Sequence, residues 1–378
     1  MDNSNNSTVI EEDTCPSPGG LKSAYGFTPG FKFHDLIAHP SQNWHLWGWL
    51  VCLVLLAITW IVALVTIVRH IRNYYDPTIQ RHKLRVLLYP PVYATLAWFS
   101  YLRYDYSTTI MFFATLFEAL AIYNLFTCLE AYLQPYRDEA EGTKEPVHTK
   151  VFGLFNVNLK SKFGFHFRTI ITIMVLQYPV WAIADALISI ITSVKGYYCG
   201  ESYSFQGAYV YLTIINFILL SLILSALFTY LAVFHNEWKR GQISAHGMFW
   251  CVKGPVMAIF YFGDILLSIL KTCNVIKGTD GTQSSDGLAW PASAVKNGLY
   301  VIIICATMTV ASILMLRFFG PQDQIRNKGS KQRITGWKAF VDAYITYIPE
   351  FFRNILCCGI DSYRLARKRA ELRKRTTP

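Results

Sequence analysis

The sequence is poor in charged residues. Only 16% of its 378 residues are Asp, Glu, Lys or Arg, whereas 53% are hydrophobic. A soluble domain normally carries about 25% charged residues. Stretches of eighteen or more mostly apolar residues recur along the chain, which is typical of helices that cross a lipid bilayer. The composition excludes an ordinary soluble fold and predicts an all-α, polytopic membrane protein.

Signatures of catalysis and of metal binding are also missing. The sequence has no G-x-S-x-G, no P-loop, no H-E-x-x-H and no Gly-rich dinucleotide fingerprint. Its nine cysteines include no C-x-x-C pair, and no His/Cys cluster has the spacing of zinc ligands. We therefore expect neither an enzyme nor a metal or other cofactor.

Seven apolar segments predict a bundle of seven transmembrane helices. We place them at about Trp44–Val68, Leu84–Leu102, Ser107–Leu133, Phe167–Val194, Ala208–Phe234, Ala245–Lys271 and Gly298–Phe318. They define a transmembrane domain at 44–320, between a polar tail at 1–43 and a basic tail at 321–378. The polar tail shows no signal peptide, so the first helix is expected to direct insertion. Asn5 and Asn6 begin N-x-[ST] sequons, a weak indication of glycosylation.

The distribution of basic residues predicts the orientation. Connections at 69–83, 134–168, 239–240 and 317–378 carry 26 lysines and arginines, against 6 in the N-terminal tail and the other connections. Loops rich in Lys and Arg stay in the cytosol. The N-terminus is therefore expected outside or in the lumen and the C-terminus in the cytosol. This pattern also explains the net charge of +11 without nucleic-acid binding.

The basic tail has helical hydrophobic periodicity over Gln332–Leu356, and its apolar positions include Trp337, Tyr344, Phe352 and Ile355. We expect an amphipathic helix that lies in the cytosolic membrane interface and contacts lipids. Cys357 and Cys358 follow, with a basic cluster after them. This arrangement favours palmitoylation; a solvated tail with two unmodified thiols is an equal alternative.

Three polar residues lie inside the third predicted helix. At 100° per residue, Glu118, Asn124 and Glu130 point to three different faces. Charged groups are costly in lipid and normally face the interior of a bundle, so this helix is expected to be central. Tyr123 shares the side of Glu130. Asn124 is more typical of a hydrogen bond between helices than of a ligand site.

Two further predicted helices carry polar stripes. On the sixth, Lys253 and Asp264 are eleven residues apart, which places them within about 20° of each other. On the fourth, Tyr178, Trp181 and Asp185 share one face. Such stripes suit a solute path, and equally a seam of ion pairs that holds the helices together.

Four motifs carry a family resemblance: HIRNYYDPTIQRHKLRVLLYPPVYATLAWFSYL (His70–Leu102), FEALAIYNLFTCLEAYL (Phe117–Leu133), VLQYP (Val175–Pro179) and FWCVKGPVMAIF (Phe249–Phe260). Through them the chain resembles the organic solute transporter alpha-subunit / transmembrane protein 184 family over about residues 44–320. The sequence lacks the acidic-Arg-aromatic triplet and the N-P-x-x-Y motif of rhodopsin-like receptors, which argues against that other class of seven-helix protein.

The closer resemblance is to the transmembrane protein 184 branch. Gln177 is not followed by the basic residue that family members often carry, and the 134–166 loop lacks the cysteine run of the transporter alpha subunits. The branch includes fungal relatives at the vacuolar membrane, which implies a vacuolar, endosomal or plasma membrane here. Some of them resemble organisers of vacuole integrity that bind an Atg8-type protein, for which the matching residues are Phe352 and Ile355. The transporter branch implies a small single-span beta-like subunit; a homo-oligomer is the alternative.

Two functions of different classes are therefore predicted. The first is facilitated transport of an amphipathic organic solute, steroid-, bile-acid- or lipid-like, along a path lined by Glu118, Tyr123, Asn124, Tyr178, Trp181, Asp185, Lys253 and Asp264. In that hypothesis the carboxylates set the polarity, Lys253 attracts an anionic group and the aromatic residues supply apolar area. The alternative is a membrane scaffold or trafficking factor that moves nothing and acts through its cytosolic helix.

Overall fold

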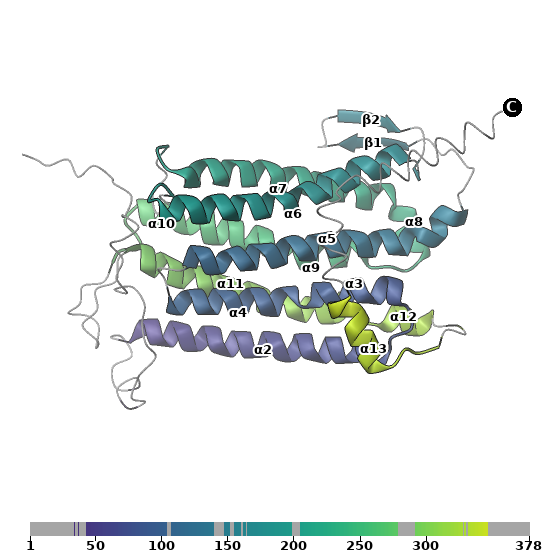
Figure 1. Ribbon diagram of the computed structural model, residues 1–378, viewed down its shortest axis with the longest axis horizontal. Helices are drawn as coiled ribbons and strands as arrows, with labels where there is room; N and C mark the ends of the chain where they lie inside the picture. Colours follow the sequence, from purple (N-terminus) through teal and green to yellow (C-terminus); the bar gives the residue numbers. More distant parts are fainter. Residues whose placement is uncertain are drawn as a thin grey trace, which may run out of the picture.

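The computed structural model describes residues 34, 37, 43–103, 107–139, 147–151, 155–159, 162–163, 165–198, 205–278, 292–327, 329 and 332–346. Long helices lie side by side in one elongated bundle (Figure 1). The helices are α2 (Trp44–Arg72), α3 (Pro77–Leu87), α4 (Tyr89–Leu102), α5 (Ser107–Glu139), α6 (Phe165–Val194), α7 (Ala208–Val233), α8 (His235–Arg240), α9 (Ala245–Ala258), η2 (Ile259–Leu266), α10 (Leu267–Thr272), α11 (Ala292–Phe318), α12 (Gln322–Arg326), α13 (Gly336–Phe340) and η4 (Val341–Ile345).

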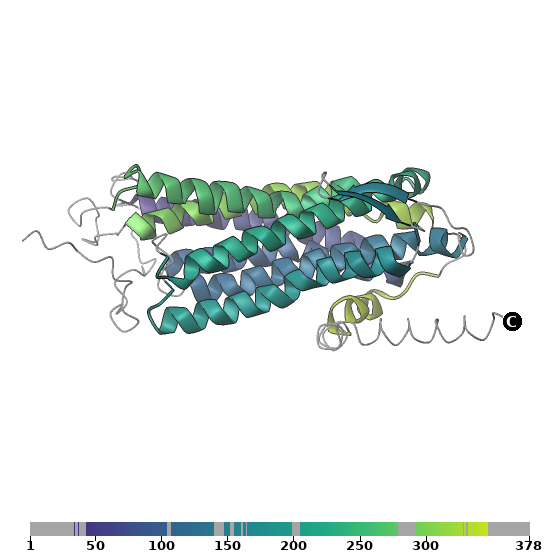
Figure 2. The same ribbon diagram turned by 90° about the horizontal axis from the view of Figure 1, so that it is seen from above.

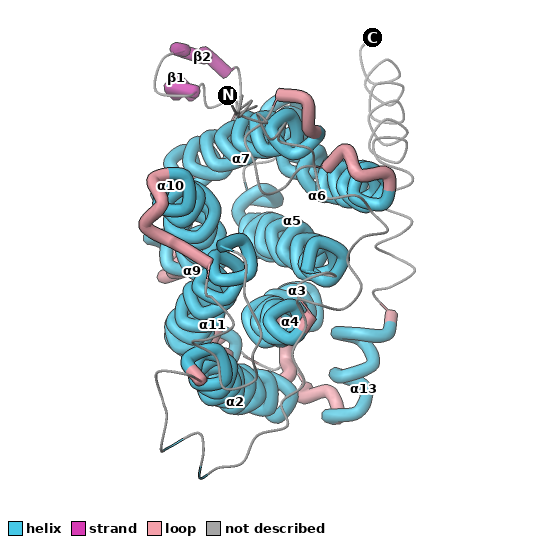
Figure 3. Tube along the Cα trace, turned by 90° about the vertical axis from the view of Figure 1, so that its left-hand side faces the viewer, coloured by secondary structure: helices cyan, strands magenta, loops and turns pink. Residues whose placement is uncertain are grey.

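Six helical stretches are long and apolar enough to cross a membrane: Trp44–Arg72, Thr109–Glu139, Phe167–Val194, Ala208–Val233, Ala245–Thr272 and Ala294–Arg326. Their number and length confirm the prediction of a multi-pass helical membrane protein. Seen along the bundle, α5 lies next to α4 on one side and α6 on the other (Figure 3). It also packs against α3 and α9, as expected for the helix with polar residues on three faces.

The second predicted helix is divided in the structure. Its first residues form the end of α3, and a turn at Leu88 separates them from the 14-residue α4. Pro90 lies in the first turn of α4, where the missing N–H of proline costs nothing, whereas inside a continuous helix it would remove a hydrogen bond. The prolines therefore set the boundary that the prediction of one helix over Leu84–Leu102 missed. The α4 helix still packs inside the bundle, against α2, α5 and α11.

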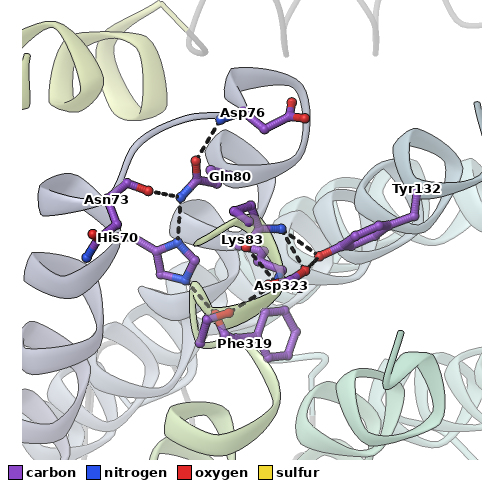
Figure 4. Close-up of polar contacts among 10 residues, drawn as sticks. His70, Asn73, Asp76, Gln80, Lys83, Tyr132, Phe319 and Asp323 are labelled. Carbon is purple, nitrogen blue, oxygen red and sulfur yellow. Dashed lines mark hydrogen bonds and ion pairs between the residues drawn. The ribbon is translucent and has the colours of Figure 1, made fainter. Parts of the chain in front are cut away.

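The corner between α2 and α3 is held by one side chain. The Gln80 Oε1 atom accepts hydrogen bonds from the backbone N–H groups of Tyr75 and Asp76, at 2.7 and 2.9 Å. Its amide nitrogen donates to the Asn73 carbonyl at 2.7 Å and lies 3.3 Å from His70 Nδ1 (Figure 4). Gln80 thus satisfies backbone groups that the corner leaves without helical partners.

A second set of contacts joins this corner to the end of α11 and to α12. The buried Lys83 ammonium lies 3.0 Å from both carboxylate oxygens of Asp323, which also accepts a hydrogen bond from Tyr132 (Figure 4). His70 Nε2 lies 2.5 Å from the Phe319 carbonyl oxygen. Each of these buried polar groups has a partner, so the end of the bundle that contains α3 and α12 is a closed, cross-linked structure.

The predicted C-terminal amphipathic helix begins at Gly336, not at Gln332. The first four predicted residues are not helical, because this stretch pairs with the α2–α3 corner through a hydrogen bond from Ile334 N–H to the Tyr74 carbonyl. From 347 onward the predicted helix lies outside the described residues. So do Phe352, Ile355, Cys357 and Cys358, as well as Asn5 and Asn6 in the N-terminal tail.

The described part of this helix packs on the bundle instead of lying free of it. Tyr74 donates to Asp342 at 2.6 Å, Arg85 Nε to the Ala343 carbonyl at 2.7 Å, and Tyr344 to the Leu84 carbonyl at 3.1 Å. Burial, with the hydrogen bond to the Asp342 carboxylate, raises the pKa of Tyr74 above its ordinary value, so its phenol stays a donor. Figure 2 shows the yellow α13 along the outside of the bundle.

One element outside the bundle was not predicted. Strands β1 (Val147–Val151) and β2 (Phe155–Leu159) form an antiparallel hairpin near the end of α7 (Figure 1). The alternation of apolar and polar residues in β2, FNVNL, is a strand signal with period two. The all-helical prediction therefore holds for the bundle and overlooks this connection.

Gly247 sets the spacing between α9 and α11, because a Cβ atom added to it would overlap the ring of Phe318. A Cβ added to Gly254, on the same helix, would come no closer than 3.9 Å to the nearest neighbouring atom. Gly247→Ala should therefore lower the free energy of unfolding by about 1–3 kcal/mol, while Gly254→Ala should leave it unchanged or raise it by up to about 1 kcal/mol. Unfolding in detergent measures both, and equal stability of the two variants would contradict this packing.

Candidate functional site

A cavity of about 230 Å³ lies inside the bundle, between α4, α5, α6, α7, η2 and α11. Its wall contains three carboxylates, those of Glu118, Asp185 and Asp264. It also contains five tyrosines: Tyr93, Tyr178, Tyr198, Tyr209 and Tyr300. Among the described residues that line it there is no Lys, Arg or His. The wall is therefore acidic and aromatic.

Glu118 belongs to a polar group that joins three helices. Tyr178 on α6 donates a 2.6 Å hydrogen bond to Glu118 Oε1 on α5. The Lys253 ammonium on α9 lies 5.0 Å from the centre of the Tyr178 ring and acts electrostatically on Glu118. Lys253 is fully buried, and its Nζ has no hydrogen-bond partner among the residues that the structure describes. Its charge is thus stabilised by the carboxylate and by the aromatic face.

Asp185 lies at the end of a short hydrogen-bond chain. The Trp181 indole donates to the Asn216 Oδ1 atom at 2.5 Å, and the Asn216 amide donates to Asp185 Oδ2 at 3.1 Å. The other carboxylate oxygen, Oδ1, is buried and has no partner among the described residues. One acceptor in the cavity wall is therefore unsatisfied, which is uncommon for a buried polar atom.

Asp264 lies on a π-helical stretch, η2, that interrupts the sixth predicted helix. Tyr300 of α11 hydrogen-bonds to Asp264 and to Tyr93. Gly263 permits this approach, since a Cβ there would lie 2.5 Å from the Tyr300 ring. Lys296 acts electrostatically on Asp264 and donates to Ser268 at 2.6 Å. A π-helix has a wider turn than an α-helix and recurs at functional sites, so the uniform 100° rotation behind the predicted stripe does not apply beyond Ala258.

The structure brings together five of the eight predicted path residues and separates the others. Glu118, Tyr178, Asp185 and Asp264 line the cavity, and Trp181 reaches it through Asn216. Lys253 lies behind the wall. Tyr123 and Asn124 are not part of the wall.

The polar residues of α5 meet different neighbours. Asn124 lies 3.2 Å from His82 Nδ1 on α3 and donates to the backbone of its own helix, which fits the interhelical role expected for an asparagine. Glu130 pairs with Arg137 and Arg168, each at 2.9 Å, and accepts a hydrogen bond from Tyr230. Of the three, only Glu118 faces the cavity.

Most tyrosines of the wall were missed by sequence reasoning, as were Asn216 and Lys296. Tyrosine is common wherever a helix meets the membrane interface, so Tyr93, Tyr198, Tyr209 and Tyr300 gave no signal that separates a cavity from an interface. Lys296 lies just before the seventh predicted helix, which begins at Gly298, and was counted only as a loop charge; in the structure it lies within α11. Their role depends on contacts between helices, which a single sequence does not contain.

A protein-family model described as organic solute transporter Ostalpha matches residues 48–324. That range contains every residue that lines the cavity, and Lys253 behind it. No solved structure matches the chain.

The pairing of Glu118 with Lys253 predicts a specific pattern of stability. Glu118→Gln or Lys253→Met alone leaves one buried charge without its partner, so each should lower the free energy of unfolding by about 3 kcal/mol. The double variant removes both charges and should recover most of that loss. Unfolding in detergent measures the cycle, with the exposed Glu139→Gln as a control that should change nothing measurable. Additive losses in the double variant would show that the two charges do not compensate each other.

Proposed function

This chain belongs to the organic solute transporter alpha family, and from this membership and the cavity inside the bundle we propose that it moves an amphipathic organic solute across a membrane. The cavity is the observation that carries the proposal. Carboxylates among membrane-spanning helices are costly and normally mark a solute or ion path. Tyrosines offer apolar ring area together with a polar hydroxyl, which suits a solute that is itself part apolar and part polar.

We place the end of the bundle with α3, α8 and α12 in the cytosol. The α2–α3 corner, α8, α12 and the β1–β2 hairpin gather at this end (Figure 1), and these are the connections richest in Lys and Arg. The seventh crossing is then made by α3 and α4 together. The 14 residues of α4 extend only about 21 Å, less than the roughly 30 Å hydrocarbon core, and α3 continues in line with it (Figure 1).

The residue roles change with the observed positions. Glu118, Asp185 and Asp264 set the polarity of the path, and Tyr178 supplies part of its ring surface. Lys253 does not reach the wall, so its proposed role is to compensate the charge of Glu118, not to attract a solute. The path opens toward the connection between α6 and α7, because Tyr198 and Tyr209 lie there.

Filling the cavity should stop transport. Ala182 is buried in the cavity wall, and Ala182→Phe adds a ring that would occupy this space. Leu187 is 52% exposed on the same helix, so Leu187→Phe is the matched control on the lipid-facing side. We expect uptake into proteoliposomes of at least one of three probes of similar size: a steroid sulfate, a neutral steroid and a hydrophobic amine. Uptake should fall at least about tenfold in Ala182→Phe and stay unchanged in Leu187→Phe.

Uptake that is equal in the wild type and in Ala182→Phe would contradict a path through the cavity. A wild type that takes up no more of any probe than empty liposomes do would contradict the transport proposal itself. Thermal unfolding of each variant shows that a loss of uptake is not a loss of fold.

The scaffold alternative has an observation of its own. Trp337 is 72% exposed and stacks on Phe340 at 5.8 Å between ring centres, while the other face of the helix is fixed on α3. Tyr344 donates to the Leu84 carbonyl, so the surface open to a partner is the aromatic pair. Exposed, stacked aromatic residues are typical anchors of protein interfaces.

If the chain is a scaffold for an Atg8-type partner, Trp337→Ala should weaken binding of the purified partner to the full-length protein about tenfold. The control is Trp250→Ala, since Trp250 is 45% exposed on the side of the bundle, in α9. Equal affinity in both variants, or no binding by the wild type, would remove this alternative.

A further inference from the structure

The three carboxylates of the cavity differ in how their charge is compensated. Glu118 has Lys253 as its cationic neighbour, and Asp264 has Lys296. Both lysines come from behind or beside the wall, not from the wall itself. Each of these two carboxylates therefore has a lysine that can compensate its charge.

Asp185 has no such compensation. Its carboxylate accepts a hydrogen bond from the amide of Asn216, a neutral donor, and no cationic group among the described residues acts on it. Its Oδ1 atom is buried and without a hydrogen bond among those residues. An ionised carboxylate with neither counter-ion nor full hydrogen bonding is costly among membrane-spanning helices. A cation bound at the Oδ1 atom would supply the counter-charge that Asp185 lacks among the described residues.

The rest of the wall is also suited to a cation. Five tyrosines line the cavity, and the negative face of an aromatic ring attracts an ammonium group within about 6 Å. Lys253 already shows this interaction from behind the wall, 5.0 Å from the Tyr178 ring centre. An inorganic cation is a poor fit, because no group of three or more His, Cys, Asp or Glu side chains in the described part of the chain is placed to hold a metal ion.

We propose that the solute accepted by this cavity carries a single positive charge: an amine or quaternary ammonium head on an apolar body. The head lies at Asp185 Oδ1 and the apolar body lies among the tyrosine rings. As a statement about what is transported, this inference rests on the proposed function; as a statement about binding, it stands alone.

An anionic head is disfavoured by the same geometry. A sulfate or carboxylate would meet three acidic side chains, and like charges at close range repel strongly where water is excluded. The ammonium of Lys253 could reach such a head only by leaving Glu118 and the Tyr178 ring, which would leave Glu118 uncompensated. The lysine behind the wall therefore does not make the cavity an anion site.

The position of Asp185 is compatible with entry of such a solute from one end of the bundle. Asp185 lies nine residues before the end of α6 at Val194, which corresponds to about 14 Å along the helix. Tyr198, which follows that end, and Tyr209 at the start of α7 are hydrogen-bonded through their backbones and also line the cavity. An apolar body about 14 Å long would therefore span the distance from the connection between α6 and α7 to the carboxylate.

The test compares three probes of the same shape and different charge. Benzyltrimethylammonium is a permanent cation, neopentylbenzene is its neutral carbon analogue, and phenylmethanesulfonate is an anion of similar size. Binding of radiolabelled benzyltrimethylammonium to the full-length protein in nanodiscs is measured, with the other two as competitors. We expect saturable binding of the cation, at least about tenfold stronger than that of either competitor.

Two substitutions test the role of Asp185. Asp185→Asn keeps the shape and removes the charge, so it should weaken cation binding at least about tenfold and leave the neutral probe unaffected. Asp185→Glu keeps the charge and should keep the preference for the cation. The control is Asp138→Asn. Asp138 is an exposed carboxylate at the C-terminal end of α5 and lies outside the cavity, so this variant should bind the cation like the wild type.

The outcomes separate this inference from the proposed function. A wild type that binds the sulfonate as tightly as the cation would overturn the inference, even if Asp185→Asn failed to fold. So would a folded Asp185→Asn variant with unchanged cation affinity. Uptake of a steroid sulfate but no binding of the cation would refute the inference and keep the transporter. Cation binding without uptake of any probe would keep the inference and refute the transporter.

Discussion

The compensation of charge inside an apolar bundle is the constraint on which this structure depends. The carboxylate of Glu118, the hydroxyl of Tyr178 and the ammonium of Lys253 come from α5, α6 and α9, which lie far apart in the sequence. Neither the carboxylate nor the ammonium could remain charged in lipid alone, because an isolated ion among spanning helices costs several kcal/mol. Their mutual contacts therefore fix how the three helices meet. They also fix the position of the cavity, since Glu118 and Tyr178 form part of its wall.

Two polar regions of the bundle differ in how completely their polar groups are paired. At the end with α3 and α12, Lys83 pairs with Asp323, and Gln80 satisfies the backbone of the α2–α3 corner (Figure 4). Such networks make a region rigid, and this one holds the first part of the His70–Leu102 motif in place. At the cavity, by contrast, Asp185 Oδ1 is left without a partner among the described residues. The first region supports the fold, and the second is open to a ligand.

The sequence was sufficient for the features that depend on composition and spacing. Long apolar runs located the spanning helices, and the cost of charge in lipid placed Glu118, Asp185 and Asp264 on one predicted path, together with five other residues. What it missed depends on backbone geometry and on contacts between helices. Pro90 divides the second predicted helix, and η2 changes the rotation per residue beyond Ala258. Lys253 lies behind the Tyr178 ring, and this position changed the role proposed for it. The position depends on how the helices pack and cannot be read from a local sequence pattern.

The π-helix η2 connects these observations. A wider turn at Ile259–Leu266 costs packing and hydrogen-bond quality, so it persists only where the surroundings favour it. Here Gly263 lets the Tyr300 ring approach the widened turn, and Tyr300 in turn bonds to Asp264 and Tyr93. Three unusual features thus occur around one cavity: a π-helical turn, a glycine at which a side chain would overlap Tyr300, and a carboxylate oxygen without a partner among the described residues. Departures from regular backbone geometry and from full pairing of polar groups tend to occur together at functional sites. In this bundle they occur where α4, α5, α6, η2 and α11 surround the space that a solute would occupy.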